Sequence, residues 1–279
     1  MYDVARRFEQ EGNRLSASHR DLYAGHRARV TATLLAAAPP AAGSLCLFGA
    51  GNALDTDLPA LLARYARVAL VDIDDEALGR AVAPLPEEAR ARVTRHAPVD
   101  LAGIFEAIEP APAPPPTHTT LAPLVAPAVA RIAGAVGGPF DVVASLCVMT
   151  QISWAVVRAV PPGLSQDGVR EAAFRVHLGA MLALLRPGGQ GFLINDLISS
   201  EYHPLDELPP DTDLLALFHE LVRTENFYRG SNPNLVLRLL RRDDALKGQA
   251  SSPRIADAWL WRGKPDRTYL VYALSFGRT

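Results

Sequence analysis

Residues 45–53 read LCLFGAGNA, a short apolar run that leads into two closely spaced glycines. A second apolar run, Val68–Val71, ends at Asp72, about 20 residues after Gly51. Glycines after a buried strand let the backbone turn tightly and approach a ligand closely. A carboxylate at the end of the adjacent strand can accept hydrogen bonds from ribose hydroxyls. The stretch therefore predicts a strand, a turn and a helix that bind a nucleoside-containing cofactor; a purely structural glycine turn is the alternative.

Apolar runs and helix-like stretches alternate along the rest of the chain. Strands are expected at residues 93–99, 140–146 and 191–194, and helices at residues 58–65, 77–82 and 169–185. Continuous apolar strands that alternate with helices indicate a parallel sheet that is buried on both faces. Apolar runs at 258–261 and 268–276, joined by a polar turn, predict a terminal antiparallel hairpin. The fold class is therefore α/β.

Three further segments complete the predicted organisation. Residues 1–40 are expected to form a helical N-terminal segment, which packs on the core or covers a site as a lid, before a main domain at 41–279. The Pro-rich stretch 109–123 predicts a surface excursion, followed by a helix at 121–136. Residues 197–253 form an inserted region that is expected to build the acceptor side of a pocket, with helices at 214–222 and 235–242.

Composition narrows the classes of partner. The chain has 279 residues and a formal net charge of -2, so it lacks the positive field that broad nucleic-acid or anionic-membrane binding requires. Neither an N-terminal signal peptide nor an apolar run long enough to span a membrane is evident, which predicts a cytoplasmic protein. Two cysteines cannot build a disulfide framework and are expected to be buried thiols. The sequence does not indicate an oligomeric state.

The element order resembles that of the class I S-adenosylmethionine-dependent methyltransferases. The resemblance covers residues 44–276 and includes FDVV at 140–143, LRPGG at 185–189 before the fifth strand, and the terminal hairpin. It implies a Rossmann-like, seven-stranded, mostly parallel sheet with an antiparallel C-terminal hairpin and helices on both faces. The ligand crevice would lie at the carboxyl ends of the strands.

The same resemblance implies that S-adenosylmethionine is the cofactor and assigns residues to it. Asp72 would bind the ribose hydroxyls, with Ile73 against the adenine, and Asp55, just inside the first helix turn, would meet the ammonium group or simply favour the helix dipole. The full cofactor set is Gly49, Ala50, Gly51, Ala53, Asp55, Asp72, Ile73, Asp100, Leu101, Ser145, Leu146 and Cys147. Leu47 stands where the family usually has an acid, which raises interest in Asp55.

The acceptor side is less defined, because a sulfonium methyl donor needs mainly alignment and desolvation from the protein. Asp196, Tyr202 and His203 are the candidate catalytic residues. A turn carboxylate is the alternative for Asp196, and a solvated loop histidine is the alternative for His203. Cys147 is expected to be a packed thiol, since the Pro-Cys of cytosine-carbon methylators is absent. No metal is expected.

Two functions of different class follow. The first is methyl transfer to the oxygen or nitrogen of a small-molecule acceptor, such as a specialised metabolite. The second is a non-catalytic module that binds S-adenosylmethionine or a nucleotide and interacts with another protein. An NAD(P)-dependent oxidoreductase is disfavoured by Leu54, which occupies the third small position of the dinucleotide fingerprint. His19, Tyr23 and His26, at helical spacings, would form one face of a lid or a surface stripe.

Overall fold

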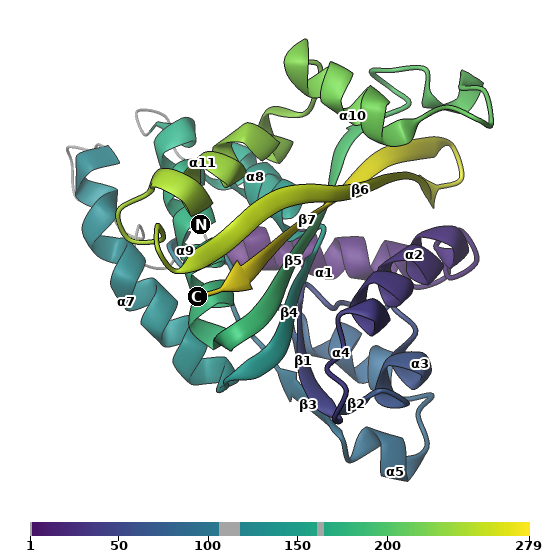
Figure 1. The fold of residues 1–279 in the computed structure, drawn as a ribbon, viewed down its shortest axis with the longest axis vertical. Helices are drawn as coiled ribbons and strands as arrows, with labels where there is room; N and C mark the ends of the chain where they lie inside the picture. The colour runs from purple at the N-terminus through teal and green to yellow at the C-terminus, as the bar shows by residue number, and fades with distance from the viewer. Residues whose placement is uncertain (1, 106–117, 161–164) are drawn as a thin grey trace.

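The computed structural model describes residues 2–105, 118–160 and 165–279, and its centre is a seven-stranded sheet (Figure 1). The strand order is β3-β2-β1-β4-β5-β7-β6. Strands β1 to β5 run parallel, while β7 pairs antiparallel with β5 and with β6. The strands are β1 (Gly43–Phe48), β2 (Tyr65–Val71), β3 (Val93–His96), β4 (Phe140–Leu146), β5 (Leu185–Ser199), β6 (Ala250–Lys264) and β7 (Arg267–Arg278). The predicted α/β class and the terminal hairpin are confirmed.

Alternate strand residues enter two separate cores, because successive side chains of a strand point to opposite faces. Cys46 and Phe48 pack with α7, α8 and α9, whereas Leu45 and Leu47 pack with α2, α3 and α4. Figure 1 shows these helix groups on opposite sides of the sheet. Their bounds are α2 (Ala24–Ala36), α3 (Leu58–Leu62), α4 (Asp75–Val82), α7 (His118–Val136), α8 (Val148–Ala159) and α9 (Gln166–Leu184).

Three local predictions need correction. The third strand ends at His96 rather than Val99, and α5 (Glu87–Arg90) precedes it. Helix α3 starts at Leu58 behind its cap Asp57, so Asp55 lies in the preceding loop and not in a helical turn. Residues 186–189, expected as a turn before a strand, are an irregularity inside β5 itself: pairing passes from Phe140–Leu185 directly to Val142–Gln190.

The N-terminal segment is helical, as predicted. Helix α1 (Tyr2–Ser16) packs against α8 and touches α4. Ala5 is its one buried residue, so little apolar burial holds it. Instead, Asn13 Nδ2 donates to Asp74 Oδ2 over 3.1 Å, and Asn52 Nδ2 donates to the Asn13 carbonyl over 2.7 Å. Polar bonds at one end therefore fasten α1 beside the glycine turn.

The region between β5 and β6 spans residues 200–249, slightly less than the predicted 197–253. It packs against β6 and α8. Its elements are η1 (Leu205–Glu207), α10 (Leu214–Arg223), η2 (Arg229–Ser231) and α11 (Pro233–Arg242), which confirms both predicted helices. Most of the Pro-rich excursion falls at 106–117, outside the described residues; the predicted helix after it is α7, which contains Pro123 and Pro127. No helix in the described ranges could cross a membrane.

Candidate functional site

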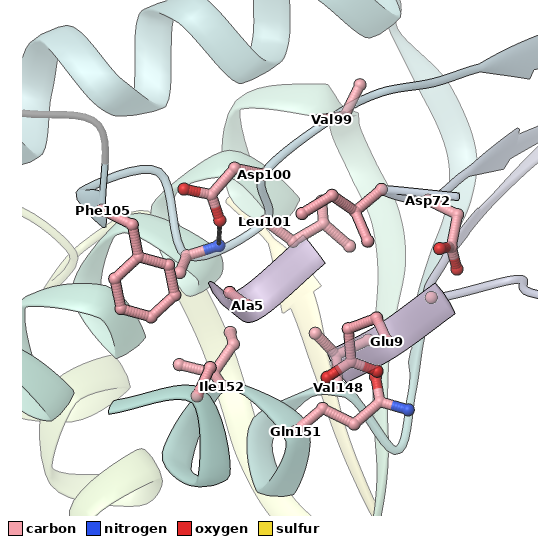
Figure 2. A pocket seen from close by; sticks show the side chains of 14 residues that line it. Ala5, Glu9, Asp72, Val99, Asp100, Leu101, Phe105, Val148, Gln151 and Ile152 are labelled. Atoms are coloured by element: carbon pink, nitrogen blue, oxygen red, sulfur yellow. Dashed lines mark hydrogen bonds between the residues drawn. The ribbon is translucent and has the colours of Figure 1, made fainter. Parts of the chain in front are cut away.

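Two adjoining cavities open at the carboxyl ends of β1 to β4. The smaller one holds about 50 Å³ and is drawn in Figure 2; the larger one holds about 610 Å³. Parallel strands place their carboxyl ends at one edge, so loops from distant parts of the chain meet there. Four residues line both cavities, and they mark the junction between them: Glu9, Gly49, Asp72 and Gln151.

The smaller cavity is mainly apolar with carboxylates at its rim. Its walls come from the ends of β2 and β3, from α8 and from α1. Apolar side chains face it together with the carboxylates of Asp72 and Asp100 (Figure 2). Flat apolar walls with a few acceptor oxygens suit a planar base joined to a hydroxylated sugar. Its further lining residues include Ala5, Ile73, Val99, Leu101, Phe105, Val148 and Ile152.

The larger cavity lies between α1, the glycine turn and the β6–β7 hairpin. Predicted cofactor residues Ala50, Gly51, Asp55, Leu146 and Cys147 line it. The opposite wall carries aromatic and charged groups, which are Tyr23, Trp261, Lys264 and Asp266. The geometry thus brings ten of the twelve predicted cofactor residues to the two cavities, and the exceptions are Ala53 and Ser145.

Asp72 ties the glycine turn to the end of β2. Its Oδ2 accepts from the Gly51 backbone N–H over 2.8 Å, and its Oδ1 accepts from the Asp74 N–H over 3.0 Å. The residue is only 7% exposed. Burial raises the pKa of its carboxyl to about 6, against the opposing effect of these backbone bonds. The cavity therefore contains a buried carboxylate that is positioned before any ligand arrives.

The glycine turn has no room for larger residues. Gly49 has a φ of +70° and Gly51 one of +45°. A Cβ on Gly49 would lie 2.3 Å from Val148 Cγ2, and one on Gly51 would lie 2.7 Å from Asn13 Oδ1. Both the backbone conformation and the close approach of α8 and α1 therefore require glycine. A cradle of this kind fits the narrow amino-acid portion of a nucleoside cofactor.

Ser145 and Ala53 do not reach either cavity, contrary to the prediction. Ser145 is fully buried, and its hydroxyl bonds His177 Nε2 at 2.8 Å. His177 Nδ1 lies 3.2 Å from the Leu101 carbonyl, which only accepts, so Nδ1 carries the proton and Nε2 accepts from Ser145. Burial lowers the pKa of His177 to about 4. This bridge joins β4 to the loop after β3, and Ser145 supports the site from within the core.

Asp55 lies beside a histidine on α2. His26 Nε2 is 3.0 Å from Asp55 Oδ1 without the geometry of a hydrogen bond, and His26 Nδ1 accepts the Trp259 Nε1–H over 3.0 Å. An indole nitrogen only donates, so Nδ1 is the acceptor nitrogen of the His26 ring. His26 also stacks on Trp261 at 4.6 Å between ring centroids. Asp55 is therefore a positioned carboxylate that lines the larger cavity.

Asp196 is a strand residue rather than a turn carboxylate, which corrects the alternative raised from the sequence. It pairs with Val271 inside the sheet and is 6% exposed. Burial raises its pKa to about 6, while a bond with the Thr150 hydroxyl lowers it. Burial is the main cause of the raised pKa values of Tyr23 and Cys147 on the wall of the larger cavity, and the charge of Asp196 adds to it. Asp196 itself lines neither cavity.

Cys147 is buried at the start of α8 with a φ of +55°. Burial and the charge of Asp196 raise the pKa of its thiol well above the ordinary value. The thiolate is the nucleophilic form of cysteine, so these surroundings agree with the predicted packed thiol. Among the described residues, no group of three or more histidine, cysteine or acidic side chains has the arrangement of a metal site.

Tyr202 and His203 lie in the turn after β5 and line neither cavity. Tyr202 is 65% exposed, with its ring edge against Tyr228. His19, Tyr23 and His26 do not share a face of one helix, as their spacing suggested. Helix α1 ends at Ser16 and α2 begins at Ala24, so His19 and Tyr23 lie in the link between them. These two still line the larger cavity, whereas His26 is buried beneath it.

Glu9 is the site residue that sequence reasoning missed. It lies on α1 and lines both cavities, opposite Asp72. No local motif surrounds it, because helix α1 is mostly polar with charges on several faces. Only the packing of α1 across the strand ends brings this carboxylate into the site.

Comparison with known proteins gives likeness at the level of structure alone. No protein-family model and no curated protein matches the sequence. An amino pentose methyltransferase from Micromonospora echinaspora matches with 22% identity and TM-score 0.34, over 61% of this chain and 50% of that one. Magnesium protoporphyrin IX methyltransferase from Synechocystis PCC 6803 matches with 16% identity and TM-score 0.44, over 94% and 84%.

The N-methyltransferase NodS from Bradyrhizobium japonicum WM9 matches with 11% identity and TM-score 0.45, over 97% of this chain and 98% of that one. All three are methyltransferases. The chain spans half the length of the first of them. At such low identities the likeness concerns the fold, and the chemistry of this chain has to be inferred from its own site.

Proposed function

We propose that this chain is an S-adenosylmethionine-dependent methyltransferase that acts on a small-molecule acceptor. The observation that carries the proposal is the buried Asp72 carboxylate, bonded to the Gly51 N–H where the two cavities meet. A carboxylate at the end of β2 beside a glycine turn is the arrangement that holds a ribose between a base and a second polar group. The cofactor supplies an electrophilic methyl group when it is bound.

The donor set fits each portion of that cofactor. Ile73 and Leu101 offer apolar contact to the adenine in the smaller cavity, and Asp100 offers oxygens to its amino group. The glycine turn receives the amino-acid portion in the larger cavity. Asp55, which lies beside His26, is the acid available for the ammonium group, because Leu47 has no charge to bind it. The cavities therefore supply a complementary group for each part of the cofactor.

The acceptor would enter the rest of the larger cavity, between the α1–α2 link and the β6–β7 hairpin. Tyr23 and Trp261 supply an aromatic wall there, with ring centroids 4.9 Å apart. Asp196 lines neither cavity, but it is buried and adjoins Cys147 of the larger cavity's wall, so it is the candidate that receives the acceptor's proton. Tyr202 and His203 also lie outside both cavities, and they lie in the turn after β5, which supports no direct role for them. In-line transfer then depends mainly on alignment and exclusion of water.

Calorimetric titration tests the proposal. The wild-type protein is titrated with S-adenosylmethionine, S-adenosylhomocysteine and NADPH, beside the Asp72→Ala and Asp75→Ala variants. Asp75 is an exposed acid on the adjacent helix α4, which makes it a matched control. We expect the first two ligands to bind, and only Asp72→Ala to lose them. Absence of binding in folded wild-type protein contradicts the proposal; binding without any release of S-adenosylhomocysteine across an acceptor screen favours the non-catalytic module.

A further inference from the structure

The junction between the two cavities contains a carboxylate with no counter-charge. Glu9 of α1 lines both cavities, and its carboxylate makes no hydrogen bond or ion pair with the described residues. Figure 2 shows it reaching from α1 toward Val148 and Gln151 of α8. By contrast, both oxygens of Asp72 already accept backbone N–H groups. Glu9 is therefore the junction acid with full capacity for a ligand.

The charges around Glu9 leave it short of positive partners. Asp72 faces it from the end of β2, and Arg158 faces it from α8. The Arg158 guanidinium is itself placed over the Phe8 ring, 4.2 Å from the centroid. Burial and the charge of Asp72 raise the pKa of Glu9 to about 8, and Arg158 opposes them only in part. Of the other acids on these walls, Asp100 lies in the smaller cavity, and the larger one has Glu11, Asp55 and Asp266 together with the cation Lys264.

The chemistry of the proposed cofactor puts its positive sulfur at this junction. Asp72 and Asp100 direct its nucleoside toward the ends of β2 and β3, and the glycine turn directs its amino acid toward the larger cavity. The sulfonium is the atom that joins these two portions. A cation beside Glu9 favours the ionised carboxylate, since opposite charges a few ångströms apart attract strongly where water is excluded. After transfer the methyl carbon is bonded to the acceptor atom, the electron pair of the broken carbon–sulfur bond stays on sulfur, and the positive charge is gone.

We propose that Glu9 is a specificity residue that distinguishes the cationic sulfonium cofactor from its uncharged thioether product. The inference rests on the proposed function. Glu9 loses a proton to solvent when the sulfonium form binds and regains one after transfer, when the thioether remains. The thioether then lies beside a protonated acid that gives it no charge attraction, which favours product release. Glu9 acts on ligand exchange, because the charge it favours decreases in the transition state and is gone in the product.

Paired titrations of the two ligands test this inference. The affinities for S-adenosylmethionine and S-adenosylhomocysteine are measured for the wild type, Glu9→Gln and Asp3→Asn. Asp3 is a matched control, because it is an exposed acid on the same helix and lines neither cavity. In Glu9→Gln we expect the affinity for S-adenosylmethionine to weaken by about tenfold or more. The affinity for the thioether should change by less than about twofold, the size of a lost neutral contact, and Asp3→Asn should match the wild type.

Proton release gives a second readout, which does not depend on affinity. Titrations in two buffers with different ionisation enthalpies, at pH 7, report protons released on binding. Wild-type protein should release protons with S-adenosylmethionine and not with S-adenosylhomocysteine, and Glu9→Gln should release none. Equal release with both ligands, or equal weakening of both by Glu9→Gln, overturns the role of Glu9 while leaving the proposed function intact. Wild-type protein that binds neither ligand overturns the proposed function, and this inference with it.

Discussion

Gly51 donates its backbone N–H to Asp72 Oδ2 over 2.8 Å, so the carboxylate that ends β2 holds the turn that follows β1. One residue therefore has two tasks: it fixes the glycine turn and presents an oxygen to the cavity junction. The carboxylate is only 7% exposed, and a positioned group loses little conformational freedom when a ligand binds. The Gly51–Asp72 contact is for this reason the centre of the candidate site.

Replacing Asp72 with Asn tests the tie directly. The amide keeps the shape of the side chain, but one of its ends is a donor and would face a backbone N–H. An unsatisfied buried donor costs about 1–3 kcal/mol. Removal of the buried charge, whose pKa is raised, offsets this cost at pH 7. The decisive measurement is therefore S-adenosylhomocysteine affinity, which we expect to fall by about tenfold. Unchanged affinity in the folded variant would argue against Asp72 as a ligand-binding group.

His177→Gln tests the bridge between β4 and the loop after β3. Burial depresses the pKa of His177 to about 4, so the stability that the neutral ring contributes is present above the ordinary histidine pKa and is lost as pH falls through about 4. At pH 7 we expect the variant to be less stable by about 1–3 kcal/mol. The difference in free energy of unfolding between wild type and variant, measured with urea, should decrease from pH 6.5 to pH 4. A constant difference across that range would contradict the proposed contribution of the bridge to stability.

Asp196→Asn should stabilise the protein while impairing turnover. Burial raises the pKa of Asp196 to about 6, so the folded protein holds more protons than the unfolded chain between about pH 4 and 6. Stability from this group is thus lost as pH rises through that window. At pH 8 the variant should be more stable than wild type, on the order of 2 kcal/mol. If Asp196 takes the acceptor's proton, kcat falls with cofactor affinity unchanged; equal loss of both would contradict that role.

Both cysteines should resist alkylation in the native protein. Cys46 and Cys147 are buried, and burial raises the pKa of each thiol. Since the thiolate is the reactive form, iodoacetamide at pH 7.5, close to neutral, should give no adduct by mass spectrometry. Denatured protein, as the control, should take up two labels. Rapid labelling of Cys147 in the folded protein would instead support a role for this cysteine as a nucleophile.

Helix α1 should respond to cofactor more than any part of the inserted region. It buries only Ala5 and is fastened through Asn13 to Asp74, so its amide hydrogens should exchange readily in the free protein. Ligand contact with Glu9 and Ala5 should slow exchange over residues 2–16, with α10 as the unaffected control. Asn13→Ala removes the hydrogen bond to Asp74, which contributes about 1 kcal/mol, and should speed amide exchange in α1. Amide exchange rates in α1 that do not change on ligand binding would contradict the placement of α1 in the site.

The sequence by itself determined the sheet and the cofactor edge. Continuous apolar runs can be buried only between two helical layers, and this requirement specifies parallel strands with their carboxyl ends at one edge. The glycine turn and Asp72 follow from the same reasoning, because each comes directly after a strand. The resemblance that these motifs support assigned twelve cofactor residues, ten of which line the two cavities.

Only the tertiary structure decided the rest, because the remaining contacts join residues with no local relationship. Trp259 and His26 are 233 residues apart, yet their bond orients the ring beside Asp55. Ser145 lies at the same strand end as residues that line the cavities, but its hydroxyl bonds His177 instead. Glu9 carries no motif at all, and the packing of a polar helix across the strand ends makes it part of the site. Spacing along the chain predicts which edge is functional, whereas side-chain direction and long-range packing decide which residues face the ligand.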